Sequence, residues 1–133
     1  VFAKATSAQY ADLAELYSAD ADYEPGTVVS IGGTAEVTIS ETANDRLVAG
    51  VVSTNPSYTM NTALTAQYPV AVALTGRVPC KVQGTINRGD LLVSAGQGRA
   101  KSSAHPGPGE VIGKALENFN GDVGVIEIMI GKH

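Results

Sequence analysis

The sequence predicts a mainly β protein: a small barrel or β-sandwich-like domain built from two pseudo-repeats, with a short N-terminal helix. Most segments are rich in β-branched residues and bounded by glycine, proline, asparagine or aspartate, which is typical of strands and turns. The chain of 133 residues holds 15 glycines and only 17% charged residues, which favours a compact, turn-rich fold over a helical bundle. Residues 24–53 also resemble residues 87–116, which indicates an internal repeat.

The segment over residues 1–22 differs in composition from the rest of the chain. In SAQYADLAELYSAD the side chains of Tyr10, Leu13 and Leu16 recur at helical spacing, and Ser7 is suited to cap the start of a helix. We therefore expect an amphipathic helical arm that packs on the chain's own sheet or on a partner copy. An extended arm lying along a neighbouring chain is the alternative.

Residues 23–133 are expected to form a single β domain. In its last apolar segment, VGVIEIMIG, only Glu127 is polar between Val125 and Ile130. An almost continuous apolar run is typical of a strand that is buried on both faces. We therefore predict a central strand here. The other expected strand segments are GTVVSI, AEVTIS, LVAGVVS, YPVAVALTGRVPCKVQG, DLLVSA and EVIGKALE.

The two copies of the repeat align without a gap. Gly26 matches Gly89 and Gly50 matches Gly113, and both pairs are 63 positions apart. In each copy a glycine turn precedes an apolar strand, and a later strand carries a glycine in its interior, which marks a bulge or a close backbone approach. Two such copies predict a pseudo-symmetric barrel or paired sheets, in which each copy covers the apolar face of the other.

Composition argues against several classes of function. The net charge is −4 and the basic residues are scattered, so we expect no nucleic-acid binding. No apolar run approaches ~18 residues and the N-terminus lacks a signal-peptide pattern, so neither membrane insertion nor a secretory leader is expected. No cofactor is expected, because the GQG and GPG triplets do not open a helix. Cys80 is expected to pack as a small apolar residue, and a lone cysteine fits a reducing compartment.

An acidic stretch offers a weak candidate metal site. Asp20, Asp22 and Glu24 alternate, so in an extended segment all three carboxylates lie on one side, where they could hold Ca²⁺. The glycine and the closing glutamate of an EF-hand loop are missing. A solvated acidic turn before the first strand of the β domain is the interpretation we favour, with no metal bound.

Two loops are candidates for ligand binding. The segment that joins the two copies, residues 53–67, offers Asn55, Ser57 and Tyr58 beside a proline, and the later loop SSAHPGPGE offers His105. If the fold has a binding end, we expect both loops to belong to it. Simple connections without a ligand are the alternative, which we favour.

Several short motifs, in the same order, resemble the C-terminal parts of tailed-phage tail-fibre and appendage proteins. The matching segments are YADLAE at 10–15, EPGTVV at 24–29 and GVVSTNP at 50–56, followed in the second half by VALTGRVPCKVQGTINRGDLLVSAGQG, VIGKALEN and GVIEIMIG. This group includes the family that carries the intramolecular-chaperone, autoproteolytic peptidase G2 domain.

The resemblance implies a structural and assembly role at the C-terminal end of a fibre. It implies a homotrimeric virion component that is made in the host cytoplasm, contacts other virion proteins and helps three chains to register. The apolar side chains of the N-terminal arm have a use in such a trimer, because they can pack near the three-fold axis. We expect Tyr10, Leu13 and Leu16 to make that contact.

Two other functions remain as alternatives. A self-cleaving chaperone would use Ser7 as nucleophile and Asp12 as its partner, but no histidine lies near them in the sequence. We therefore expect that the chain is not an enzyme. A receptor-binding module would hold a host-surface glycan or protein with the two candidate loops.

Overall fold

The computed structural model describes residues 12–54, 56 and 58–131. All the regular secondary structure in these residues is β-strand. No helix in this part of the chain is long and apolar enough to span a membrane. The strands are β1 (Asp12–Ser18), β2 (Val28–Ile31), β3 (Val37–Ile39), β4 (Val48–Val52), β5 (Tyr58–Met60), β6 (Pro69–Gln83), β7 (Leu91–Gly96), β8 (Arg99–Ser102), β9 (Gly113–Ala115) and β10 (Val123–Ile130).

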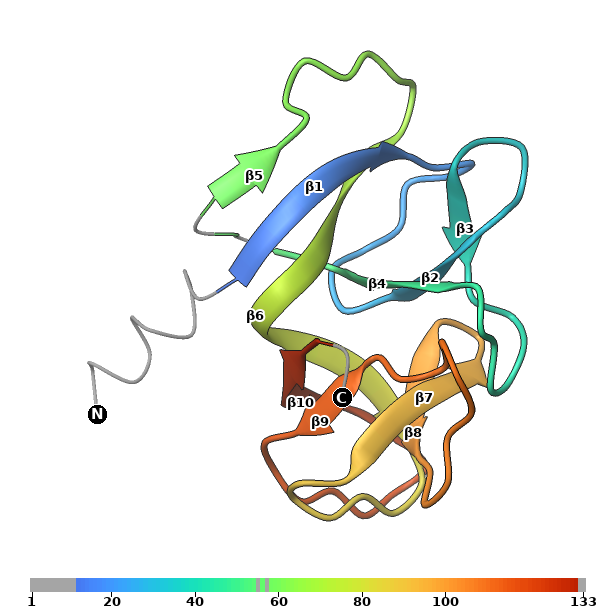
Figure 1. Cartoon of the computed structure of the whole chain (residues 1–133), viewed down its shortest axis with the longest axis vertical. Helices are drawn as coiled ribbons and strands as arrows, with labels where there is room; N and C mark the ends of the chain where they lie inside the picture. The colour runs from blue at the N-terminus through green and yellow to red at the C-terminus, as the bar shows by residue number, and fades with distance from the viewer. Residues whose placement is uncertain (1–11, 55, 57, 132–133) are drawn as a thin grey trace.

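Five strands form a closed barrel (Figure 1). Around the ring β6 pairs with β8, β8 with β7, β7 with β9, β9 with β10, and β10 returns to β6. All of these pairings are antiparallel except the one between β6 and β8, which is parallel at Val82 and Ala100. Closure of the ring gives each barrel strand a partner on both sides, which removes exposed edges.

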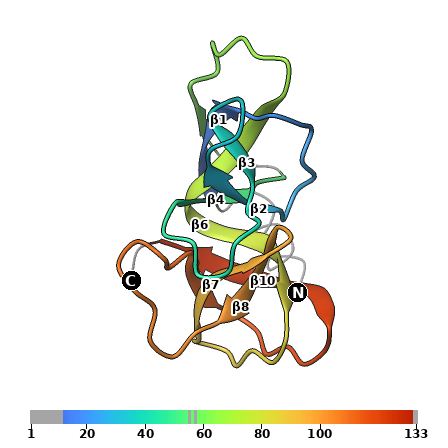
Figure 2. The same cartoon turned by 90° about the vertical axis from the view of Figure 1, so that its right-hand side faces the viewer.

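The remaining strands extend from the first half of the 15-residue strand β6. There β6 pairs with β1 on one side and with β4 on the other, and β2 and β3 follow β4. A bridge between Ala19 and Val37 joins the end of β1 to β3, and β5 lies parallel to β1. We call β1–β4 with the first half of β6 the N-terminal ring; β6 runs through both this ring and the barrel (Figure 2).

The pairing registers of the N-terminal ring recur in the barrel 63 positions later. The two sequence copies therefore occupy equivalent places in two rings of the same connectivity, and each ring closes through one parallel contact. Matching pairs are Val29–Gly50 with Leu92–Gly113, Ile31–Val37 with Ser94–Ala100, and Ala19–Val37 with Val82–Ala100.

The strand-interior glycines lie where backbones approach closely, as predicted. A Cβ atom at Gly113 would lie 2.0 Å from the carbonyl oxygen of Met129, and one at Gly50 would lie 2.8 Å from that of Ala73. Only glycine fits at either position without a shift of the backbone.

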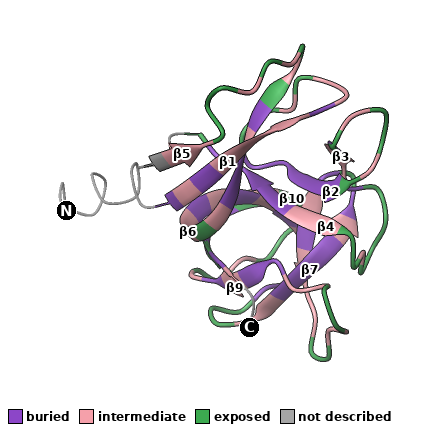
Figure 3. Cartoon of the chain, turned by 45° about the horizontal axis from the view of Figure 1, so that its top comes forward, coloured by how far each residue is buried: buried purple, intermediate pink, exposed green. Residues whose placement is uncertain are grey.

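One buried cluster lies within the N-terminal ring, and a larger one fills the barrel and extends to Val28, Val51 and Ala73 of the N-terminal ring. Buried residues are concentrated in the strands (Figure 3). The prediction that the last strand is buried on both faces is wrong. On β10, Ile128 is fully buried, whereas Val123 and Val125 are 55% and 60% exposed. The outer face of β10 is therefore open, as on any barrel strand whose inner side chains fill the core.

The helix predicted near the N-terminus is wrong for residues 12–18, which form strand β1. Seven residues of β1 pair with β6, and Leu13 also pairs with Tyr58 of β5. Ala14 is fully buried, while Leu13 and Leu16 are half-buried. Pairing along both edges overrides the helix propensity of this Ala-, Leu- and Glu-rich stretch. Ser7 and Tyr10 lie outside the described residues.

Candidate functional site

A cleft of about 810 Å³ opens between the loop after β8 and the strands β4 and β6. Residues 104–109 form one wall, and residues 48–50 and 73–74 face them, with Ile112 and Ile130 also lining the space. The lining side chains are mostly aliphatic or proline. Such a surface suits an apolar segment better than a charged ligand.

The loop that forms the cleft wall is held in place by Glu110. The Glu110 carboxylate accepts a hydrogen bond from the Gly107 amide (2.9 Å) and one from the side-chain amide of Asn44 (3.3 Å). Pro106 and Pro108 fix their own backbone angles. The wall is therefore pre-formed, and it is tied to the corresponding loop of the first copy through Asn44.

No described residue of the segment 53–67 joins the later loop at the cleft. His105 is exposed and lines the cleft. Tyr58 belongs to β5, where its backbone pairs with that of Leu13. Asn55 and Ser57 lie outside the described residues. The loop at the cleft meets instead the loop of residues 41–46, which has the same position in the first copy.

The acidic stretch stabilises the N-terminal ring and links it to the barrel half of β6. Asp20 accepts hydrogen bonds from Tyr23 (2.5 Å) and Thr38 (2.8 Å), and these bonds, led by that of Tyr23, lower the pKa of its carboxyl group. Glu24 forms an ion pair with Lys81 of β6, which lowers the pKa of Glu24. Among the described residues, Asp20, Asp22 and Glu24 do not come together as a group that could hold a metal ion.

Asp12 is buried at the start of β1 and is 4% exposed. Burial raises the pKa of the Asp12 carboxyl group, while a hydrogen bond with the Ser53 side chain opposes the shift. Ser53 was not singled out in the sequence, because nothing in its local pattern shows that it lies beside Asp12. The self-cleavage alternative pairs Asp12 with Ser7, and Ser7 lies outside the described residues.

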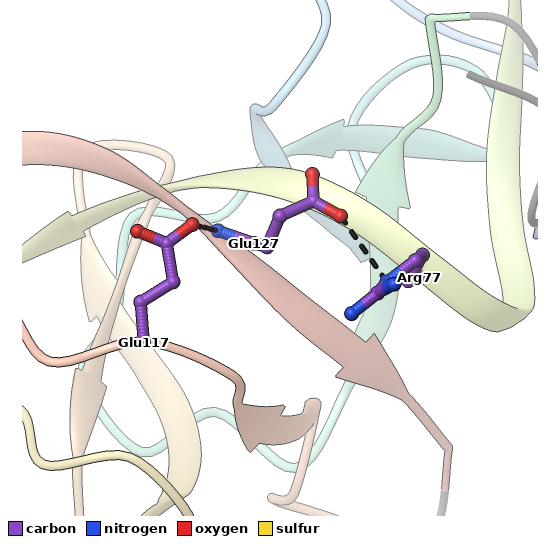
Figure 4. A network of polar contacts seen from close by, with 3 residues as sticks. All are labelled: Arg77, Glu117 and Glu127. Atoms are coloured by element: carbon purple, nitrogen blue, oxygen red, sulfur yellow. Dashed lines mark hydrogen bonds and ion pairs between the residues drawn. The ribbon is translucent and has the colours of Figure 1, made fainter. Parts of the chain in front are cut away.

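A polar network lies on the outer wall of the barrel between β6 and β10 (Figure 4). The Glu127 carboxylate is 3.4 Å from Nε of Arg77, and the Glu127 amide donates to the Glu117 carboxylate at 2.9 Å. These contacts connect β6, β10 and the loop after β9 on the outside of the barrel, so they support the barrel wall rather than line a cavity.

Cys80 points into the barrel core and is fully buried. Burial raises the pKa of its thiol to about 12. Its thiolate is therefore scarce at neutral pH, and the residue packs as a small apolar side chain, as the sequence predicted.

A solved structure shares this fold. The N base of the head fibre gp8.5 of bacteriophage phi29 is similar to this chain with a TM-score of 0.52 and 15% sequence identity, over 89% of this chain and 96% of that chain. No family model matches the sequence, and no curated protein matches it.

The similarity to the phi29 head-fibre base extends over the whole architecture. Because 89% of this chain is covered, the match must include both the N-terminal ring and the barrel. At this level of identity it establishes a common fold.

Proposed function

We propose that this chain is a structural domain of a phage fibre or appendage and is built into the virion as a homotrimer. The observation that supports this most is the similarity to the phi29 head-fibre base over 89% of this chain and 96% of that one. The short motifs that resemble tail-fibre ends point independently to the same class of protein.

The physical character of the described residues suits a scaffold. The barrel is closed, a second ring is built on the same long strand, and one of the two apolar clusters extends across both rings. The buried ionisable groups Asp12 and Cys80, whose pKa values burial raises, are withdrawn from solvent. Such a domain serves as a rigid end piece or connector of a fibre.

The place of the domain within the particle is a finer part of the proposal. The phi29 structure is the base of a head fibre, whereas the sequence motifs resemble the C-terminal ends of tail fibres. In either place, this proposal makes the chain an attachment or end piece of a trimeric appendage. The half-buried side chains Leu13 and Leu16 of β1, together with Tyr10, remain the proposed contacts to partner chains.

Detection of the chain in purified particles tests this function. An antibody against the chain, used in immunogold electron microscopy of purified virions, is expected to label fibres or their attachment points. Mass spectrometry of the same particles should find the chain, and a non-structural phage protein should be absent as the control. A chain that is abundant in infected cells but missing from purified virions would refute the proposal.

A further inference from the structure

The barrel and the N-terminal ring contact each other in a head-to-tail manner. The end of β7 and the turn that follows it lie on the loop of residues 41–46. The Ser94 hydroxyl donates to the carbonyl oxygen of Thr42 and accepts from the amide of Asp45, both at 2.8 Å. The Gly98 carbonyl also accepts from the Val28 amide at 2.8 Å. One face of the first ring thus receives the hairpin of the second.

The surfaces that correspond to this ring-to-ring contact, one on the barrel and one on the N-terminal ring, are both open. The covered face of the N-terminal ring contains Val28 and residues 41–46. The barrel residues 63 positions after them are Leu91 and residues 104–109, and these line the cleft. The hairpin of the N-terminal ring that corresponds to residues 94–99 is residues 31–36. Its first residue, Ile31, takes the place of Ser94 and is 61% exposed.

The chemistry of the two open surfaces has changed in a matched way. Within the chain, the hydroxyl of Ser94 bonds to the Thr42 carbonyl and the Asp45 amide. At the equivalent positions Ser94 is replaced by Ile31, and Asp45 by Pro108, which has no amide hydrogen to donate. The contact between the two rings of one chain is thus polar, whereas the two corresponding open surfaces carry an apolar side chain, Ile31, and an apolar cleft wall at Pro108.

We propose that residues 31–36 of one copy of this chain dock into the cleft of the next copy, with Ile31 against His105 and Pro108. The contact repeats between chains the ring-to-ring contact that exists within each chain. A head-to-tail interface of this kind closes into a ring when its rotation permits. Closure with three copies rests on the proposed function, whereas the contact surfaces follow from the repeat.

Strand β1 lies beside the same interface. Within the chain, the Lys81 amide donates to the Gly26 carbonyl at 3.0 Å. The equivalent positions are Ser18 at the end of β1 and Gly89 before β7. In the single chain the Ser18 amide donates to the Glu36 carboxylate at 2.8 Å. Docking between copies would bring this end of β1 to the turn before β7, which places Leu16 close to the contact.

Site-directed cross-linking tests which surfaces meet. The variants Ile31→Cys and His105→Cys are prepared separately and refolded together, then treated with a short bismaleimide. Covalent dimers are expected in the mixture and not in either variant alone, and the double variant should yield covalent trimers. The unmodified chain is the control, because the buried Cys80 thiol, with a pKa of about 12, does not react.

A matched pair of charge substitutions tests the same surface without a reagent. Ile31→Glu should reduce the molar mass measured by light scattering threefold, to the 13.6 kDa of one chain. Val125→Glu, at a β10 position of almost equal exposure (60%), should leave it unchanged. Circular dichroism must show both variants folded.

The outcomes separate this inference from the proposed function. A stable trimer that neither cross-links through positions 31 and 105 nor dissociates with Ile31→Glu overturns the docking surface but leaves a trimeric fibre domain standing. Dissociation by Val125→Glu alone would assign the contact to the outer face of β10. A chain that stays monomeric at all concentrations overturns both.

Discussion

Single residues show how far the repeat is carried into the structure. Gly50 and Gly113 both face a carbonyl oxygen of a neighbouring strand. A Cβ atom added at either position would lie closer to that oxygen than van der Waals contact allows. A glycine inside an apolar strand was enough to predict a close approach. The atom that each glycine meets depends on strand register, which no local pattern contains.

Substitution of Gly113 tests this close approach. Gly113→Ala should lower the free energy of unfolding by about 3 kcal/mol, because the methyl group meets backbone that moves only with its whole strand. Gly121→Ala, where the nearest atom is 3.3 Å away on the ring of Phe119, should change it far less. Urea unfolding followed by circular dichroism measures both, and equal losses would contradict the assigned register.

Two buried or bonded aspartates should respond to pH with opposite signs. The pKa of Asp20 is lowered below its ordinary 3.8, so its stabilisation is complete above pH ~4 and is lost as the pH falls through the folded-state pKa. The advantage of the wild type over Asp20→Asn should therefore shrink between pH 6 and pH 3. Urea midpoints across this range measure it, and a constant difference would argue against the bonds from Tyr23 and Thr38.

For Asp12 the sign is reversed. Burial raises its pKa above 3.8, so the charged form is unfavourable in the folded state and the penalty is relieved as the pH falls through the folded-state pKa. Relative to Asp12→Asn, the wild type should gain stability from pH 7 towards pH 4. The same titration that follows Asp20→Asn is the internal control, and a loss of relative stability on acidification would contradict the burial of a carboxylate here.

Whole strands show where sequence patterns were sufficient and where they failed. Gly-bounded, β-branched segments predicted most of the strands after residue 23. Strand β1 contains no β-branched residue, so its local preference is helical, and only its pairing with β5 and β6 makes it a strand. On β10 the outer valines resemble core residues in the sequence, and burial could not be assigned without knowing which face the barrel closes over.

Alanine substitutions on β10 test its two faces. Ile128→Ala should cost about 2–5 kcal/mol, because it removes a fully buried side chain from the barrel core. Val125→Ala, three residues away on the open face, should cost under about 0.5 kcal/mol. Thermal and urea unfolding measure both changes. A large loss of stability in Val125→Ala, measured on the monomer, would support the prediction that β10 is buried on both faces.

At the scale of the molecule, the gapless repeat was visible in the sequence, and the recurrence of strand pairings 63 positions apart follows it. The sequence did not show that one strand, β6, serves both rings, because its two halves carry different partners far away in the chain. The cleft was also hidden, since only one of its two walls comes from a loop that was singled out.

The molar mass in solution tests the central claim most directly, namely that two rings of one chain form a fibre domain that associates as a trimer. Light scattering on the purified chain at tens of micromolar should give three times the chain mass of 13.6 kDa. A single species of 13.6 kDa across that concentration range would contradict it.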